Sequence, residues 1–144
     1  MIYADTSCLL KVLRPEPLSE AVWSAIHKET SVVVSVLAEL ETLVQLKAGW
    51  TGGTLTRSHW RQAEARFGIL KNQPPFEFRA LPSALFQTAL RQHRNSVDKH
   101  CRSLDRLHLA AMEELEISRL MTHDEAQAKA ATEAGFEVVR PGRG

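Results

Sequence analysis

Short apolar runs alternate with helical segments along the chain, and this alternation constrains the fold more than any other feature of the sequence. The run at residues 32–34 contains only valine, as expected of a strand that is buried on both faces. Further runs read as strands at residues 2–4, 76–81, 117–121 and 136–139. Because helical segments connect these strands, the pattern predicts an α/β protein, a three-layer sandwich with a central, mostly parallel five-stranded sheet.

The segments between the strands carry residues that typically start and stop helices. The expected helices end near Leu13, His27, Ala48, Leu70, Arg94, Leu115 and Ala134. Residues 49–53 read as a turn cluster, Ser58 as the start of the fourth helix, and Pro82 with Ser83 as the start of the fifth. No repeat or linker divides the chain, so a single domain over residues 1–144 is expected.

The sequence gives no support to membrane, secreted or disulfide-rich classes. No apolar run approaches the roughly 18 residues that a membrane span needs, and the N-terminus lacks the basic start and long apolar stretch of a secretory signal. Cys8 and Cys101 form neither a metal-ligand pattern nor a disulfide framework. We therefore expect a cytoplasmic protein with reduced thiols and no membrane contact.

Residues 57–106 are strongly basic, although the whole chain has a net charge of only +1. They contain ten Lys and Arg residues against four Asp and Glu residues, a local charge of +6, and the remainder of the chain carries −5. A basic segment between acidic flanks suits a polyanionic partner such as nucleic acid. A solvated helical surface explains the same charge equally well, and the few aromatic residues in this segment give little sign of base stacking.

Four acidic residues stand where a merely structural acid is not expected, namely Asp5, Glu41, Asp105 and Asp124. Asp5 and Asp124 each close an apolar run that reads as a strand. Ligands of open parallel sheets bind beyond the carboxyl ends of the strands, so both aspartates are candidates for a binding site.

Both aspartates also have a structural explanation, because a single Asp after a strand more often caps the next helix. Thr6 or Ser7 could replace the first aspartate as the cap. Thr122 and Glu125 could form a capping box around the last helix and leave the second aspartate available.

The third acid is either Glu39 or Glu41. At about 100° per residue, Glu41 shares a helical face with four apolar residues, and Glu39 lies nearly opposite. The four apolar residues are Leu37, Leu40, Val44 and Ala48. Further leucines give this helix a second apolar side, so the pattern favours Glu41 without excluding Glu39.

Asp105 shares a helical face with His108 and with the apolar residues Leu109, Met112 and Leu115. An ionised carboxylate on an apolar face costs several kcal/mol unless it is paired or bound to a metal. An ion pair with an arginine and a metal ion are both possible solutions. His108 could be a metal ligand, but a hydrogen-bonded core histidine is the commoner role.

Carboxylates gathered at short range raise one another's pKa or recruit a cation. Mg²⁺ and Mn²⁺ prefer sites that are built from oxygen ligands. If the four acids meet, they predict a metal-dependent enzyme that acts on phosphates. The sequence contains no Gly-rich phosphate loop, no Gly-x-Ser-x-Gly elbow and no zinc-type histidine spacing.

Four motifs, in this order, make the chain resemble a PIN domain, specifically the VapC-type toxin ribonucleases. The first is an apolar strand that leads into Asp5-Thr6-Ser7. The second is the Ser-to-Glu segment that begins at Ser35, and its spacing also selects Glu41. The third is the Asp-x-x-His-x-Ala helix that begins at Asp105, and the fourth is Met-Thr-His-Asp124 before an alanine-rich helix. Together they extend over nearly the whole chain.

The resemblance implies a parallel sheet flanked by helices, with the four acids at one edge. It implies that these acids hold Mg²⁺ or Mn²⁺, and that two hydroxyl residues support them or bind water. The acids are Asp5, Glu41, Asp105 and Asp124, and the hydroxyl residues are Ser7 and Thr122.

The resemblance also implies an activity and two partners. The activity is metal-dependent hydrolysis of RNA that leaves a 5′-phosphate and a 3′-hydroxyl, carried out by the toxin of a type II toxin–antitoxin pair. The partners are a second copy of the chain and a cognate antitoxin whose tail lies across the groove. Arg106 and His123 depart from the family pattern, and Arg106 could reach a phosphate.

Three other classes of protein are alternatives. A haloacid-dehalogenase-like phosphatase also has Asp after its first strand, but it needs a second acid where Ser7 stands. A receiver domain needs an acidic pair before its phosphorylated Asp and a late Lys, and neither is apparent. A non-catalytic PIN-like domain that binds RNA or protein is the remaining alternative, and the presence of all four acids argues against it.

Overall fold

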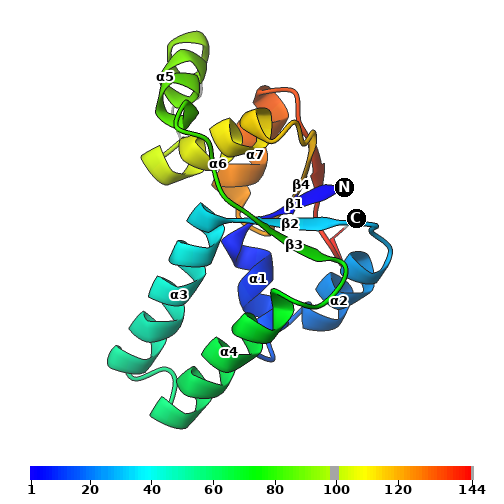
Figure 1. Ribbon diagram of the computed structural model, residues 1–144, viewed down its shortest axis with the longest axis vertical. Helices are drawn as coiled ribbons and strands as arrows, with labels where there is room; N and C mark the ends of the chain where they lie inside the picture. The colour runs from blue at the N-terminus through cyan, green and yellow to red at the C-terminus, as the bar shows by residue number, and fades with distance from the viewer. Residues whose placement is uncertain (98–100, 144) are drawn as a thin grey trace.

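A central sheet of five parallel strands organises the computed structural model, which describes residues 1–97 and 101–143 (Figure 1). The strands are β1 (Ile2–Ala4), β2 (Val32–Ser35), β3 (Phe76–Arg79), β4 (Arg119–Met121) and β5 (Glu137–Val139). Their order across the sheet is β3-β2-β1-β4-β5, and every neighbouring pair is parallel. The predicted five-stranded α/β fold is therefore confirmed, with β1 at the centre of the sheet.

The helices of the described residues cover both faces of the sheet. They are α1 (Thr6–Leu13), α2 (Ser19–His27), α3 (Val36–Thr51), α4 (Arg57–Leu70), α5 (Leu85–Asn95), α6 (Ser103–Glu114) and α7 (Glu125–Glu133). Helices α1 to α4 pack on one face and α5 to α7 on the other, which confirms the three-layer arrangement (Figure 1). None of these helices is long and apolar enough to span a membrane.

The residues of β1 divide between the two faces of the sheet, because side chains alternate along a strand. Ile2 and Ala4 belong to the core formed with α1 to α4. Tyr3 belongs to the core formed with α5 to α7. The valines of β2 divide in the same way and are fully buried, as expected for a β-branched run inside a sheet.

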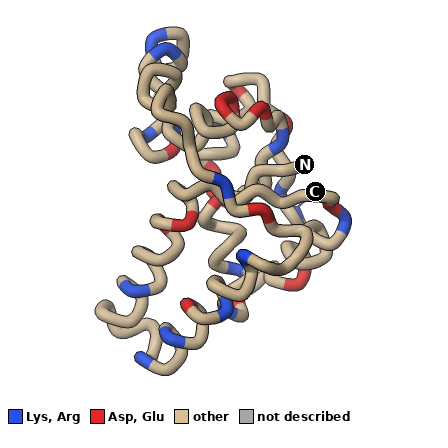
Figure 2. Tube along the Cα trace, in the orientation of Figure 1, with Lys and Arg blue, Asp and Glu red and all other residues tan. Residues whose placement is uncertain are grey.

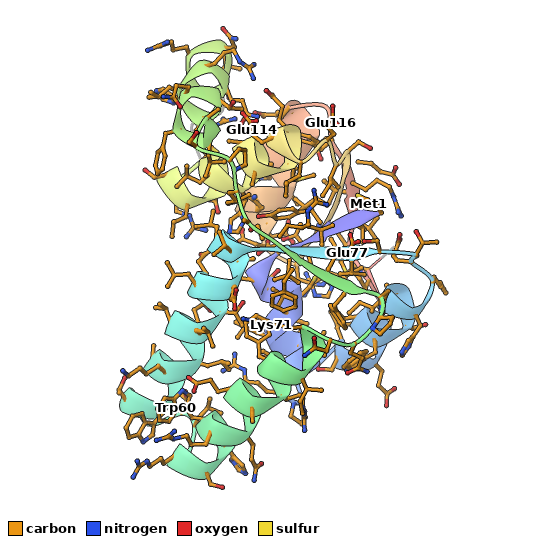
Figure 3. All side chains as sticks on the ribbon, viewed as in Figure 1. Met1, Trp60, Lys71, Glu77, Glu114 and Glu116 are labelled. Carbon is orange, nitrogen blue, oxygen red and sulfur yellow. The ribbon has the colours of Figure 1, made fainter. Side chains whose placement is uncertain are left out.

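The hairpin of α3 and α4 differs from the sequence prediction at its turn. Helix α3 continues to Thr51, past Gly49, where the sequence predicts the turn. Trp50 in the last turn of α3 stacks on Trp60 of α4, with ring centroids 4.4 Å apart and ring planes 7° apart. Figure 3 shows Trp60 near the far end of this hairpin. The aromatic contact stabilises a helical turn that the local sequence alone does not favour.

Several other element ends lie a few residues from their predicted places. Thr56 caps α4 by accepting a hydrogen bond from the backbone N–H of His59, slightly before the predicted start. Helix α5 begins at Leu85, later than predicted. Strand β3 ends at Arg79 because its pairing partner β2 ends at Ser35, the residue opposite.

Within the described residues, the basic segment 57–106 is divided between the two faces of the sheet. Figure 2 shows Lys and Arg along α4 and along α5, which pack on opposite faces. Asp98 and Lys99 of this segment lie outside the described residues. The segment that is continuous in sequence is therefore split into separate basic surfaces in space.

Candidate active site

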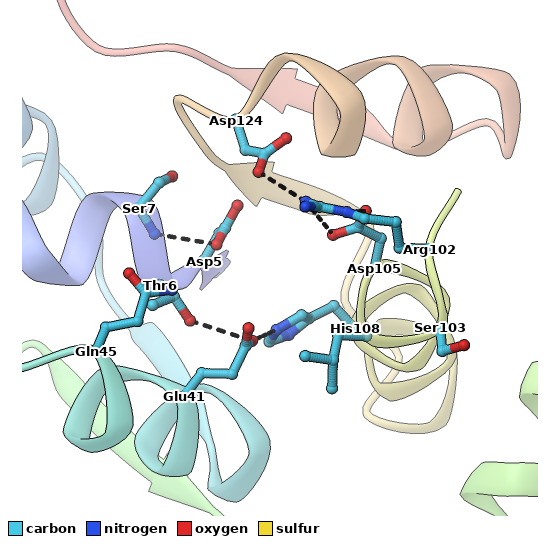
Figure 4. Close-up of a pocket in the computed structure, with 11 residues that line it drawn as sticks. Asp5, Thr6, Ser7, Glu41, Gln45, Arg102, Ser103, Asp105, His108 and Asp124 are labelled. Atoms are coloured by element: carbon cyan, nitrogen blue, oxygen red, sulfur yellow. Dashed lines mark hydrogen bonds and ion pairs between the residues drawn. The ribbon is translucent and has the colours of Figure 1, made fainter. Parts of the chain in front are cut away.

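A pocket of about 560 Å³ opens at the carboxyl ends of β1 and β4. Between these two strands the chain connections leave towards opposite edges of the sheet, which makes this place a topological switch point. Ligands of open α/β sheets bind at such switch points. The lining residues are Asp5, Thr6, Ser7, Glu41, Gln45, Arg102, Ser103, Leu104, Asp105, His108 and Asp124. The structure thus brings all four predicted acids to one pocket (Figure 4).

Asp5 connects β1 to α1 and is buried. One carboxylate oxygen caps α1 by accepting a hydrogen bond from the backbone N–H of Ser7 at 3.1 Å. The other oxygen accepts a hydrogen bond from the hydroxyl of Thr122. Burial raises the pKa of Asp5, the Thr122 hydrogen bond opposes this shift, and the charge of Asp124 adds to it. Asp5 therefore caps a helix and also faces the pocket, with a carboxyl group whose ionised form is disfavoured by burial.

Ser7 and Thr122 link the ends of β1 and β4 behind the carboxylates. Thr122 is fully buried, and its hydroxyl accepts a hydrogen bond from the backbone N–H of Asp124 at 3.0 Å. The Ser7 hydroxyl accepts one from the backbone N–H of His123 at 2.9 Å and lies 3.4 Å from the Thr122 hydroxyl. These contacts allow two side chains without charge to position the aspartates of two different strands.

The capping box predicted at the start of α7 does not form. Asp124 itself is the N-cap, because its Oδ1 accepts a hydrogen bond from the backbone N–H of Gln127 at 3.0 Å. The Thr122 hydroxyl donates to Asp5 and accepts from the backbone N–H of Asp124, so it holds the two aspartates rather than capping the helix. Glu125 pairs with an arginine of the C-terminal segment.

Glu41 lies in the pocket, but the helical-face argument for it is wrong. Leu40 and Val44, which the pattern places inward, are 60% and 57% exposed. Helix α3 instead buries a narrower face, which consists of Ala38, Thr42 and Leu46. The helical-face pattern placed apolar residues of this helix inward, but part of the apolar surface of α3 faces solvent.

Glu39, the alternative to Glu41, does not line the pocket. It forms an ion pair with Lys71, which lies at the end of α4 (Figure 3). This contact gives Glu39 a structural role between two helices. The spacing in the sequence motif, rather than helical periodicity, selects the glutamate that the structure places in the pocket.

A chain of buried hydrogen bonds leads from the sheet to Glu41. Nε2 of His108 donates to the Glu41 carboxylate, and Nδ1 lies 2.6 Å from the hydroxyl of Tyr3. The Tyr3 hydroxyl is in turn 2.6 Å from the hydroxyl of Ser35. The Tyr3 hydroxyl can donate to one of these neighbours and accept from the other, so it is satisfied at both of its contacts. His108 is therefore a hydrogen-bonded core residue that also reaches the pocket.

The position of Glu41 is fixed from two sides. Thr6 donates its hydroxyl to the same carboxylate oxygen at 3.3 Å (Figure 4). Burial raises the pKa of Glu41, but the hydrogen bond and charge of His108 and the hydrogen bond of Thr6 outweigh it, so the pKa lies below its ordinary value. Burial thus raises the pKa of Asp5, whereas hydrogen-bonded partners lower that of Glu41.

Asp105 is buried on the inner face of α6 together with His108, Leu109 and Met112, whereas Leu115, also predicted on that face, is the C-cap and only partly buried. Its charge is balanced by Arg102, whose Nε donates to Asp105 Oδ2 at 3.0 Å. The same guanidinium donates through Nη2 to Asp124 Oδ2 at 3.3 Å (Figure 4). The ion pair with an arginine, one of the two solutions expected for Asp105, is the one that the structure contains.

Some residues of the pocket were not identified from the sequence. Arg102 is the most consequential, and its position three residues before Asp105 at a helix start is the signal that could have revealed it. Conversely, Arg106 does not reach the pocket. It is buried between α6 and α5 and donates to Gln92 at 3.4 Å, and its contact with a phosphate stays a prediction.

The donor chemistry of the pocket fits a hard divalent cation. Its four carboxylates offer only oxygen ligands, which Mg²⁺ and Mn²⁺ prefer. A positive group, the guanidinium of Arg102, already bridges two of these carboxylates. Over residues 1–97 and 101–143, no three His, Cys, Asp or Glu side chains are grouped to hold a metal ion as they stand. The ligands therefore fit by type, but the present contacts of Asp105 and Asp124 with Arg102 would have to open.

Comparison with known proteins identifies a family model that covers most of the chain. The model is described as PIN domain, and it matches residues 2–133. None of the curated proteins gives a significant match.

Several solved structures share this fold at low sequence identity. VapC20 of Mycobacterium tuberculosis, a toxin that cleaves the sarcin-ricin loop, has a TM-score of 0.72 and 19% identity, over 98% of this chain and 100% of the other. FitAcB of Neisseria gonorrhoeae has a TM-score of 0.68 and 18% identity, over 98% of each chain. VapBC2 of Rickettsia felis, bound to a promoter DNA fragment, has a TM-score of 0.70 and 12% identity, over 96% of this chain and 98% of the other.

Proposed function

The chain belongs to the PIN domain family, and on this premise we propose that it is a metal-dependent endoribonuclease that hydrolyses phosphodiester bonds of RNA. We propose further that it is the toxin of a type II toxin–antitoxin pair and acts in the cytoplasm. One observation carries the proposal: Asp5, Glu41, Asp105 and Asp124, from four separate parts of the chain, line one pocket at the carboxyl edge of the sheet.

The proposed cofactor is Mg²⁺ or Mn²⁺. The four pocket carboxylates would hold it, directly or through water, after Asp105 and Asp124 give up their present contacts with Arg102. When bound, such a cation supplies an activated water and neutralises charge on the scissile phosphate.

The uncharged neighbours of the carboxylates would keep the ligands in place. The Thr122 hydroxyl and the Ser7 backbone N–H orient Asp5, and His108 and Thr6 orient Glu41. Groups that hold metal ligands from behind tune both the geometry and the affinity of the site. Since Asp5 and Glu41 are already fixed by buried partners, only Asp105 and Asp124 need to exchange an exposed partner, Arg102, for the cation.

RNA is the proposed substrate, cut by in-line attack to leave a 5′-phosphate and a 3′-hydroxyl. The Lys and Arg residues of α4 and α5 would contact the phosphate backbone, which makes the affinity dependent on salt (Figure 2). VapC20, which shares this fold, is described as cleaving the sarcin-ricin loop. A folded RNA with exposed loop bases is accordingly the proposed substrate class, because proteins read RNA sequence mainly in unpaired regions.

The competing function is a PIN-like domain that binds RNA or protein without cleaving. Incubation with RNA, with and without Mg²⁺ or Mn²⁺, separates the two functions. We expect cleavage by the wild type only with the cation, and none by Asp5→Asn. Cleavage that a chelator leaves unchanged, or equal cleavage by the variant, would contradict the proposed metal-dependent activity.

A cognate antitoxin is the proposed protein partner, as the family resemblance implies, and the fold likeness to VapBC2 supports it. A homodimer is the proposed assembly. Val36, Leu40 and Val44 follow one another at helical spacing on α3 and are 50%, 60% and 57% exposed. Contiguous exposed apolar residues of this kind mark interaction surfaces. Light scattering at micromolar concentration should give a dimer mass that Leu40→Asp reduces, whereas a monomeric wild type would refute this assembly.

A further inference from the structure

Arg102 is the one Lys or Arg residue among those that line the acidic pocket in the described part of the chain. It stands at the N-cap position of α6, and its side chain is 69% exposed. Its guanidinium joins Asp105 of α6 to Asp124 of α7, at 3.0 and 3.3 Å (Figure 4). A single exposed cation therefore spans two carboxylates that belong to different helices.

This contact contributes little to holding the two helices together. The link to α7 is the pair with Asp124, whose two side chains are 69% and 34% exposed, and ion pairs at the surface contribute at most about 1 kcal/mol because water and salt screen them. A buried contact already joins α6 to α7, because the side chain of Gln127, 1% exposed, donates to the backbone carbonyl of Asp105 at 3.3 Å. Asp124 has its own structural contact, since its other oxygen caps α7. Arg102 can therefore leave the carboxylates without opening the helix interface.

We propose that Arg102 is an exchangeable counter-ion of the pocket, an inference that rests on the function proposed above. Its guanidinium neutralises Asp105 and Asp124 while no divalent cation is bound, and it competes with the cation for both carboxylates. Once displaced, it contacts a phosphate of the bound RNA. Guanidinium groups suit both roles, because their planar N–H donors match carboxylate and phosphate oxygens equally well.

Two physical consequences follow from this exchange. Removal of the guanidinium leaves Asp105 and Asp124 without their positive partner, so the cation should bind more tightly. Removal also takes away a phosphate contact, so RNA should bind less tightly once the cation is present.

Isothermal titration of the purified protein with Mn²⁺ tests the first consequence. Arg102→Ala should bind Mn²⁺ about tenfold more tightly than the wild type, given two lost ion pairs. Arg119→Ala is the matched control, because Arg119 is partly exposed and forms ion pairs with Glu29 and Glu137 outside the pocket, and its Mn²⁺ affinity should equal that of the wild type. Equal or weaker binding by Arg102→Ala would overturn the competition.

Steady-state cleavage at saturating Mn²⁺ tests the second consequence. Arg102→Ala should raise KM several-fold relative to both wild type and Arg119→Ala, and an unchanged KM would overturn the phosphate contact. The titration also separates this inference from the proposed function. If no protein binds Mn²⁺, both fail; if all three bind it equally, only the role of Arg102 fails.

Discussion

The hydroxyl of Tyr3 lies 2.6 Å from Nδ1 of His108, and this contact joins the centre of the sheet to the acidic pocket. Tyr3 is on the central strand β1 and is fully buried, while His108 is on the inner face of α6. The other nitrogen of His108 donates to Glu41 of α3. The position of one pocket carboxylate is thus set by groups from three different elements.

Tyr3→Phe should therefore weaken the pocket from a distance. The substitution keeps the ring but leaves both the Nδ1 of His108 and the hydroxyl of Ser35 without their buried partner, at a cost of about 1–3 kcal/mol. The expected loss of activity is about 10- to 100-fold, as for other residues that position metal ligands. Urea unfolding and RNA cleavage measure the two effects.

Trp60→Phe is a control for the Tyr3 variant. The indole N–H of Trp60 is buried without a hydrogen-bond partner among residues 1–97 and 101–143, and the ring lies in the α3–α4 hairpin rather than in the pocket. This variant should lose stability through poorer packing but keep its activity. If both variants lose activity in proportion to their loss of stability, the positioning role of Tyr3 is wrong.

Alkaline titration offers a second test of the same buried hydroxyl, because Tyr3 is the single tyrosine of the chain. Burial raises its pKa far above the ordinary value of about 10, so the folded state keeps the proton that the unfolded chain loses. The free energy of unfolding therefore keeps its full value below a pH of about 10. Above this pH it falls by about 1.4 kcal/mol per pH unit, because only the unfolded chain releases the proton. Ultraviolet absorbance should show phenolate only on unfolding; phenolate in a protein with native circular dichroism would contradict this.

Asp5→Asn should stabilise the cation-free protein. Burial raises the pKa of Asp5, so the native state binds its proton more tightly than the unfolded chain does. The protein is then most stable below the ordinary Asp pKa of about 4. Its stability falls as the pH rises towards the raised pKa of Asp5 in the folded state, and above that pKa the full cost of the buried charge is present. The uncharged amide removes this cost, and we expect a gain of about 1–3 kcal/mol at neutral pH.

Thermal unfolding between acidic and neutral pH measures this difference. The wild type should lose stability over this range more steeply than Asp5→Asn. Mn²⁺ should raise the melting temperature of the wild type more than that of the variant, since a ligand stabilises the state that binds it. A variant that is less stable than the wild type at neutral pH would show that the Asp5 charge is well compensated without a cation.

The fold followed from the sequence because its signals are local and repeated. The valine run of β2 and the helical crossovers specify buried parallel strands wherever they occur. The end of α3 was not predictable in this way, because the stacking of Trp50 on Trp60 depends on the packing of two helices. Asp5 and Asp124 could be located because strand ends meet at one edge, but their capping contacts depend on where neighbouring hydroxyls lie.

The counter-ions of the pocket were the least predictable feature. Sequence spacing placed Asp105 on a buried face, but it did not reveal which arginine of the basic segment is its partner. The link from Tyr3 to His108 joins residues that are more than a hundred positions apart, and no periodicity in either segment indicates it. Such contacts follow from the three-dimensional arrangement of the sheet and α6, which local patterns do not encode.

Glu41 and Glu39 provide the sharpest test of the site, because they are two residues apart on one helix and differ in surroundings. Glu41 lines the pocket and binds His108 and Thr6, whereas Glu39 pairs with Lys71 outside it. Glu41→Gln should reduce RNA cleavage more than about a hundredfold, since even residues that only support metal ligands cost 10- to 100-fold. Glu39→Gln should change cleavage less than about twofold and stability by less than about 1 kcal/mol, the value of an exposed ion pair.

Both variants keep the size and polarity of the side chain, so matched circular dichroism and melting curves establish that the fold is intact. Loss of cleavage in Glu39→Gln with full cleavage in Glu41→Gln would remove Glu41 from the site, and with it the motif spacing that selects it.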